Sequence, residues 1–172
     1  AIDAQLDRGA AAFAEIFGAP PRAFAAPAWY LTDDAFEALE ARRFDYLSVS
    51  RGLAPPFFPR VRGRVLSTLE IPTTLSTLDE DLGRDGITPE NYVARLLERY
   101  RPDANEVLTV HAETEGLAYR SLFQQLLARH REQGIETLPM QLLAAEAGGR
   151  AVAGDVALGE IPGRSGKVVI AR

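Results

Sequence analysis

Hydrophobic and polar positions along the chain follow two spacings. Apolar residues that recur every three or four positions predict helices over residues 1–17, from 32 to about 43, from 77, from 88, and over 117–133 and 141–147. Short apolar runs bounded by turn residues predict strands over residues 22–29, 44–50, 69–74, 106–112 and 135–138. The strongest strand pattern is 106–112 and the strongest helix pattern is 117–133. Strands and helices therefore alternate, as is typical of parallel βα units.

Two stretches depart from this alternation. Residues 51–64 hold three prolines and two glycines, so they are predicted to form a loop. The Phe57–Phe58 pair within it favours a lid or a binding loop, and gives a hypothesis for contact with a membrane. From residue 151 the chain is rich in glycine and ends in an apolar run, which predicts a terminal hairpin closed by residues 163–166.

About five parallel strands with flanking helices leave two α/β architectures. A full (β/α) barrel needs roughly seven or eight strands and about 250 residues. The 172 residues would then be the C-terminal part of a barrel, about three units short on its N-terminal side. An open, doubly wound sheet of five strands is the alternative. In either case residues 1–172 are expected to be a single domain, by their length.

Composition excludes several classes of function. The formal net charge is −5, so nucleic acid is not an expected partner, because phosphate binding needs a basic face. The chain has no cysteine, which excludes disulfides, thiol nucleophiles and zinc–thiolate sites, and only two histidines, too few for a histidine-rich metal site. Neither GxGxxG after a strand nor GxxxxGK[ST] occurs, which excludes nucleotide binding by those two devices.

His111 is the leading candidate for chemistry. It ends the predicted strand 106–112, and the carboxyl ends of parallel strands form the catalytic rim of α/β folds. Glu113 and Glu115 follow in an acidic loop, and a histidine beside carboxylates can be held as imidazolium, ready to act as a general acid. The alternative is a histidine bonded into the sheet edge beside two solvated glutamates.

Other strand ends supply further candidates. Trp29 would line a pocket or fill the core. Arg51 would clamp a phosphate or a carboxylate, or lie on the surface. Thr73 and Thr74 would offer hydroxyls to a substrate, although strand propensity explains them equally. His130, late in a helix, is assigned a structural role, and helix capping accounts for the carboxylates of residues 79–81.

Several of these residues carry a resemblance to a known family. The stretch His111-Ala-Glu-Thr-Glu-Gly116 resembles the HAE-x-EG segment of the bacterial 4-deoxy-4-formamido-L-arabinose-phosphoundecaprenol deformylases, which belong to the polysaccharide-deacetylase (NodB-like) superfamily. Further matching stretches, in the same order and spacing, are Ala26–Trp29, Arg51-Gly52, Pro56-Phe57 with Pro59, Ile71–Thr74, Thr77–Glu80 and Gly159–Arg164. The resemblance spans nearly all of the chain.

The resemblance implies a distorted, incomplete (β/α) barrel of the NodB type and a metal-dependent amide hydrolase. A divalent metal, zinc, manganese or similar, would activate a water that attacks a formamide or acetamide carbonyl. The family's aspartate base and its Asp-His-His ligands precede the matched segment, so the chain alone is expected to contribute no metal ligand. His111 would act near the leaving amine, and Trp29, Arg51, Thr74, Glu113 and Glu115 would contact substrate.

The same resemblance implies partners and a location. The substrate would be a lipid-linked amino sugar used in lipid A modification, and an N-terminal segment of the same barrel, on this or another chain, would supply the metal. The expected location is the periphery of the bacterial inner membrane, on its cytoplasmic side, or otherwise the cytoplasm. The chain departs from the family pattern at Val49, where close relatives carry an acidic residue, and at Tyr30. A degenerate, non-catalytic domain that binds a carbohydrate or lipid head group is therefore the alternative.

Overall fold

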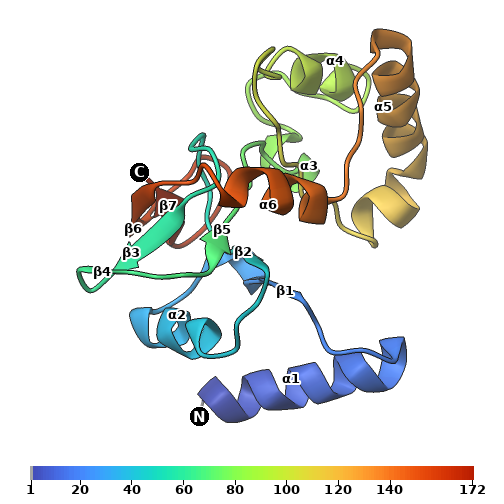
Figure 1. The fold of residues 1–172 in the computed structure, drawn as a ribbon. Helices are drawn as coiled ribbons and strands as arrows, with labels where there is room; N and C mark the ends of the chain where they lie inside the picture. The colour runs from blue at the N-terminus through green and yellow to red at the C-terminus, as the bar shows by residue number, and fades with distance from the viewer. Residues whose placement is uncertain (1) are drawn as a thin grey trace.

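The computed structural model describes residues 2–172 and contains two sheets (Figure 1). The first is a three-stranded parallel sheet in the order β1-β2-β5, formed by β1 (Ala23–Ala25), β2 (Tyr46–Ser48) and β5 (Leu69–Glu70). The second has the order β4-β3-β6-β7, formed by β3 (Phe58–Val61), β4 (Arg64–Val65), β6 (Ala153–Gly159) and β7 (Val168–Ala171). Its β3–β6 pair is parallel and its other two pairs are antiparallel.

Helices lie around the sheets at the places that the apolar spacing predicts. They are α1 (Ile2–Phe17), α2 (Asp33–Glu40), α3 (Leu78–Asp81), α4 (Tyr92–Leu97), α5 (Arg120–Gln133) and α6 (Met140–Gly148). Thr32 begins α2 by accepting a hydrogen bond from the backbone N–H of Ala35 at 3.3 Å. Gly134 ends α5 in the left-handed conformation, with φ of 69°. No helix within residues 2–172 is long and apolar enough to cross a membrane.

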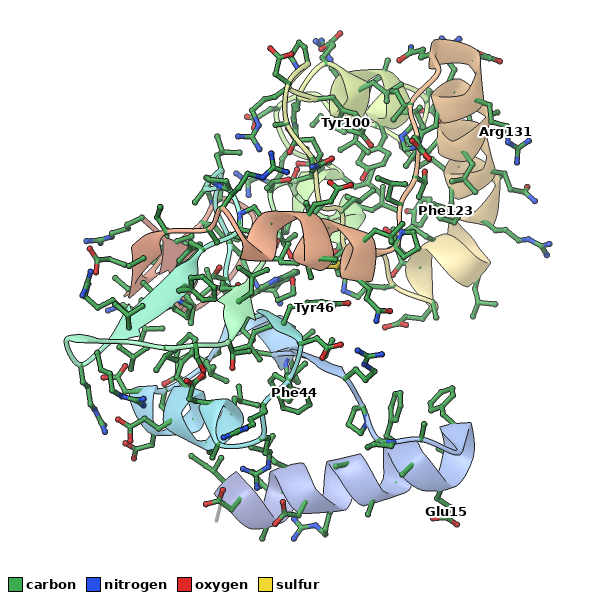
Figure 2. The ribbon with its side chains drawn as sticks, viewed as in Figure 1. Glu15, Phe44, Tyr46, Tyr100, Phe123 and Arg131 are labelled. Atoms are coloured by element: carbon green, nitrogen blue, oxygen red, sulfur yellow. The ribbon has the colours of Figure 1, made fainter. Side chains whose placement is uncertain are left out.

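The hydrophobic interior is divided between two clusters of buried side chains. One lies between α2 and the parallel sheet and includes Phe36, Leu39, Leu47 and Val49. The other joins α3, α4 and α5, and Tyr100 and Phe123 pack against it (Figure 2). Because each cluster fixes its own helices, the segment between them, which carries the ends of β2 and β5, is held from both sides.

Arg51 links the two sheets. Just after β2, it forms parallel bridges to Thr73, beyond β5, and to Ile170 in β7. Its backbone N–H donates to Val169 O at 2.8 Å, and its carbonyl accepts from Ala171 N–H at 2.9 Å. The carboxyl end of β2 therefore lies between the end of β5 and β7.

The α/β class is confirmed, but the expected five parallel strands are wrong. The strands predicted at 22–29, 44–50 and 69–74 are present in shorter form, whereas 106–112 and 135–138 form no strand. At the first of these, the backbone N–H groups of Thr74 and Leu75 both donate to Val107 O, and the Thr74 hydroxyl accepts from Val107 N–H. The Thr74 hydroxyl thus takes the place of a backbone carbonyl as the acceptor for Val107 N–H. The backbone pairing between the two segments therefore ends at Val107 and does not extend into a strand. At the second, Leu138 is 42% exposed and has no neighbouring strand among the described residues.

Residues 51–64 are also not the predicted open loop. They include the β3–β4 hairpin, and Phe57 is only 4% exposed. The Phe57 ring lies so close to Gly154 that a Cβ there would be 2.5 Å from its Cδ2, so the glycine is what admits the ring. Phe57 is therefore unavailable for the hypothesised membrane contact. The terminal hairpin is confirmed as β6–β7, whereas the described residues form neither a closed barrel nor a five-stranded open sheet.

Candidate functional site

A buried ion pair occupies the carboxyl end of β2. The two outer guanidinium nitrogens of Arg51 donate to the two carboxylate oxygens of Glu80 at 2.8 and 2.9 Å, and Nη2 also donates to Leu75 O. Their side chains are 8% and 2% exposed. Burial alone would raise the pKa of Glu80, but the hydrogen bonds from Arg51, from Thr77 N–H and from Arg164 outweigh it and hold the pKa below its ordinary value. The charged form of Glu80 is therefore favoured between Arg51 and Arg164.

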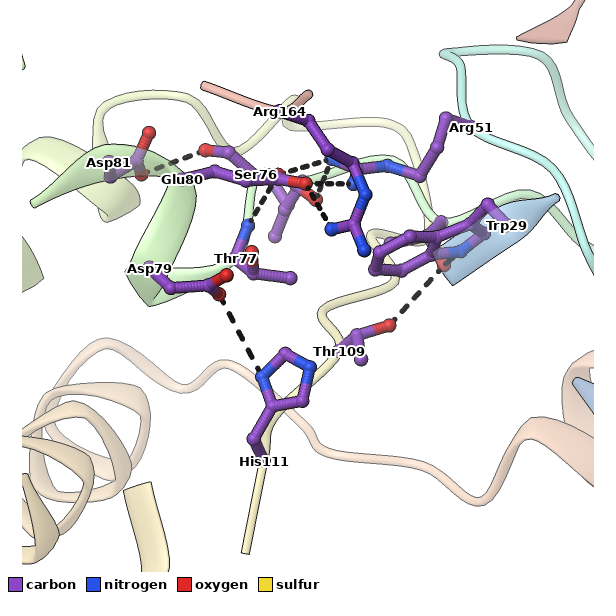
Figure 3. A network of polar contacts seen from close by, with 12 residues as sticks. Trp29, Arg51, Ser76, Thr77, Asp79, Glu80, Asp81, Thr109, His111 and Arg164 are labelled. Carbon is purple, nitrogen blue, oxygen red and sulfur yellow. Dashed lines mark hydrogen bonds and ion pairs between the residues drawn. The ribbon is translucent and has the colours of Figure 1, made fainter. Parts of the chain in front are cut away.

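Trp29 lies against two arginines at this point (Figure 3). The guanidinium carbon of Arg51 is 4.5 Å from the ring centroid, and that of Arg164, from the β6–β7 turn, is 4.7 Å from it. Arg164 Nη1 also donates to Glu80 Oε1 at 3.1 Å. The indole N–H donates to Thr73 Oγ1 at 3.1 Å. Contacts on the ring and on the indole nitrogen together fix Trp29, which is 6% exposed.

His111 lies beside this network, on the extended segment that follows Val107. Its Nδ1 is 3.8 Å from Asp79 Oδ1, and the two side chains are 34% and 57% exposed (Figure 3). Its backbone N–H donates to the Glu115 carboxylate at 2.7 Å. Two residues earlier, the Thr109 hydroxyl is 3.4 Å from that of Thr73, the partner of Trp29. Side-chain contacts therefore connect Trp29 to the segment that carries His111.

The remaining predicted site residues are placed differently. Thr74 Oγ1 donates to Glu106, whose carboxylate also receives Arg101 Nε at 2.7 Å, so this hydroxyl serves the local fold. Glu115 is 4% exposed, with one oxygen on the His111 backbone and the other without a partner within residues 2–172. Glu113 is exposed and has no hydrogen bond to another described residue. The structure thus brings together Trp29, Arg51 and His111, with Glu115 behind the histidine.

A second buried carboxylate, Glu70, lies behind the end of β2. Its Oε1 accepts from the backbone N–H groups of Val49 and Ser50 at 3.0 and 2.8 Å and from Ser50 Oγ at 2.6 Å. Its Oε2 is buried and has no partner among the described residues. Burial raises the pKa of Glu70 to about 7, although these three hydrogen bonds oppose the shift. Near neutral pH this carboxyl therefore exists in both charge states.

Comparison with known proteins shows what this chain is similar to. The chain is 33% identical over 139 residues to a protein of Shewanella sediminis named probable 4-deoxy-4-formamido-L-arabinose-phosphoundecaprenol deformylase ArnD, a match that covers 81% of this chain and 44% of that protein. It is 30% identical over 132 residues to a protein of the same name from Wigglesworthia glossinidia brevipalpis, covering 76% and 46%. Over most of its own length, the chain is therefore similar to these two ArnD proteins. No protein-family profile matches it.

The ArnD-like chain spans less than half the length of the curated relatives it matches. The resemblance inferred from the HAETEG stretch and its companion motifs is confirmed by these matches. The functional names are those of the relatives.

The described residues do not fit the divalent metal that the resemblance implies. Within residues 2–172, no group of three or more histidine, aspartate or glutamate side chains is placed to hold a metal ion. His111 and Asp79 form a pair without a third ligand from this part of the chain. The second histidine, His130, lies on α5, where its Nε2 is 2.9 Å from the Tyr100 hydroxyl. Burial lowers the pKa of His130, in keeping with the structural role predicted for it.

The sequence did not predict the contacts that four residues of the site make. Asp79 and Glu80 belong to a stretch that fits a capping box. Its Glu80 half is present, with Thr77 N–H donating to Glu80 Oε2 at 3.0 Å, whereas Thr77 Oγ1 has no hydrogen-bond partner among the described residues. Capping explained both carboxylates fully, so nothing in the sequence pointed to their partners across the site. Arg164 lies in a predicted turn, and Glu70 in a predicted strand. Only the pairing of distant segments reveals these contacts, because 84 positions separate Arg164 from Glu80 along the chain.

Proposed function

We propose that this ArnD-like chain forms the His111 side of an amide hydrolase that removes a formyl or related acyl group from a lipid-linked amino sugar. The relatives support the reaction class through their names. The observation that carries the proposal is the placement of His111. Its ring is partly exposed, lies 3.8 Å from Asp79, and stands beside the network around Trp29.

His111 acts as the proton donor in this reaction. Hydrolysis of a formamide adds water to the carbonyl carbon and breaks the bond from that carbon to nitrogen, which gives formate and an amine. An amine leaves readily only when its nitrogen is protonated as the bond breaks, and a histidine near neutral pH is well suited to supply that proton.

Trp29 and the charged groups beside it form one wall of the site. The outer guanidinium nitrogens of Arg51 donate to Glu80 and to Leu75 O and are not free to bind substrate. The role of Arg51 is therefore to hold Trp29 and Glu80 in place. Arg164 is more accessible, with a side chain that is 20% exposed. It extends the same wall towards solvent and presents positive charge to a phosphate-linked substrate. Glu113, exposed beyond His111, is the remaining residue positioned to meet the sugar.

The metal and the remaining partners belong to the proposal as well. A divalent ion, zinc or manganese or similar, would be held by ligands from a segment outside the described residues, which would complete the barrel. The partners are then that segment and the lipid-linked substrate. The location is the periphery of the inner membrane, on its cytoplasmic side, where such a substrate is accessible.

Formate release from a lipid-linked 4-formamido sugar tests the proposal in the protein isolated from its source. The comparison is between wild type and His111→Gln, with His130→Gln as the matched control. Loss of formate release in His111→Gln alone supports the proposal. Tight binding of the sugar without turnover by wild type would instead favour the non-catalytic binding domain.

A further inference from the structure

We infer that Asp79 is the positioning residue for His111, and that it selects Nε2 as the nitrogen that transfers the proton. The inference rests on the proposed function for its catalytic meaning. In the structure, it concerns the contact between two side chains that are 32 positions apart in the sequence. Asp79 lies at the start of α3, and His111 lies at the end of the extended segment.

The two side chains are presented to each other by separate anchors. Asp79 lies in the first turn of α3, where the Glu80 carboxylate accepts the backbone N–H of Thr77 at 3.0 Å. Glu80 is in turn fixed by Arg51, so the turn that carries Asp79 is tied to the buried ion pair. On the other side, Glu115 accepts the backbone N–H of His111 at 2.7 Å. Neither partner depends on the other for its backbone position, which is the arrangement expected of a prebuilt pair.

The ring faces Asp79 with one particular nitrogen. Nδ1 is the atom 3.8 Å from Asp79 Oδ1, and Figure 3 shows the other ring nitrogen turned to the opposite side, towards Thr109 and Trp29. A carboxylate on Nδ1 favours the neutral form that carries its proton there, and leaves the lone pair on Nε2. Nε2 is then free to take up a proton and pass it to the amine that leaves. Catalytic contacts of this kind are often long before substrate binds, and they tighten afterwards.

The charges around His111 leave Asp79 as the carboxylate that acts on the ring. Glu115 uses one oxygen on the backbone of His111, and its other oxygen has no partner within the described part of the chain. Asp79 is 57% exposed, so replacing it disturbs no packing, and its substitution isolates the contact with the ring.

The test is nitrogen-15 NMR of the histidine rings in this chain, comparing wild type, Asp79→Asn and Asp85→Asn. Asp85 is an exposed aspartate in the turn after α3 and makes no ion pair within residues 2–172, so it controls for loss of one charge. The spectrum of His111→Gln assigns the signals, since the chain has only two histidines. We expect the ratio of the Nδ1–H form to the Nε2–H form of His111 to fall about threefold in Asp79→Asn and to stay unchanged in Asp85→Asn. An unchanged ratio in Asp79→Asn, with the thermal midpoint preserved, would overturn the inference.

The formate-release assay separates this inference from the proposed function. If wild type releases formate, Asp79→Asn should lower kcat about tenfold with little change in KM, because the sugar does not contact Asp79 in this scheme. If wild type releases none while the tautomer shift is present, the proposed function fails and the positioning of His111 by Asp79 stands. If Asp79→Asn keeps full kcat, the positioning role is contradicted even though the hydrolase assignment stands.

Discussion

Glu80 receives both outer guanidinium nitrogens of Arg51 in a buried, two-pronged ion pair. Arg164 from the β6–β7 turn joins the same carboxylate, and Trp29 lies against both arginines. One carboxylate thus ties together the end of β2, the start of α3 and the terminal hairpin.

Replacement of Glu80 by glutamine should destabilise the chain strongly. The neutral side chain in Glu80→Gln would leave Arg51 buried without a counter-charge, a change that typically costs about 3–5 kcal/mol in free energy of unfolding. For a chain of this length, that lowers the thermal midpoint by about 10 °C. Calorimetry measures the thermal midpoint. The control is Glu37→Gln, which weakens the exposed Arg62–Glu37 contact and should change the free energy of unfolding by less than about 0.5 kcal/mol. Equal midpoints for the two variants would contradict the central place of Glu80.

Glu70 should make stability fall as pH rises towards neutrality. Burial raises its pKa in the folded chain to about 7 from an ordinary value of 4.5. A raised pKa in the folded state means that the stabilising contribution is complete below pH 4.5 and is lost as pH rises through about 7. By linkage, the loss amounts to about 3 kcal/mol.

Chemical denaturation at about pH 5 and about pH 8 measures this dependence. Glu70→Gln replaces the carboxyl with a group that stays neutral, so the free energy of unfolding should change about 2–3 kcal/mol less between these two pH values than in wild type. Glu136→Gln, at an exposed position, should follow the wild-type dependence. If Glu70→Gln tracked wild type as well, the carboxyl would not titrate in this range.

Two glycines of the β6–β7 turn offer a matched test of the site wall. Gly163 and Gly166 have almost the same φ, +85° and +83°. A Cβ on Gly163 would lie 2.5 Å from the Glu80 carbonyl oxygen, whereas one on Gly166 would meet no atom within 4 Å. Both alanine variants carry the backbone strain of a positive φ, about 1 kcal/mol, but only Gly163→Ala should push Arg164 away from Glu80 and Trp29. Fluorescence of the single tryptophan reports it: we expect a shift in Gly163→Ala and none in Gly166→Ala.

The sequence predicts the helices and the short parallel strands well because their signals are local. Apolar spacing and the Thr32 and Gly134 caps fix helix positions within a few residues. The pattern of 106–112 is equally strand-like, yet it fails because a strand needs a neighbour, and the Thr74 hydroxyl ends the pairing at Val107. Local patterns also predicted Trp29, Arg51 and His111 at strand ends. Only Arg51 lies just beyond a strand, because Trp29 is in a short 3-10 turn after β1 and the segment that carries His111 forms no strand.

The sequence did not reveal which charged side chains form ion pairs with each other. The carboxylates of Asp79 and Glu80 are fully explained by helix capping when they are considered locally. Their second roles, on His111 and Arg51, depend on the folding together of segments 29 to 32 positions apart. Glu70 likewise resembles an ordinary strand residue until burial shows that it has no access to water.

The central claim is that His111 donates a proton in hydrolysis of a formamide on a lipid-linked sugar. The most direct measurement is formate released per enzyme by the protein from its source, with wild type, His111→Gln and His130→Gln assayed side by side. We expect His111→Gln to lower kcat about 10²–10⁴-fold and His130→Gln to retain activity. Equal formate release by wild type and His111→Gln would contradict it.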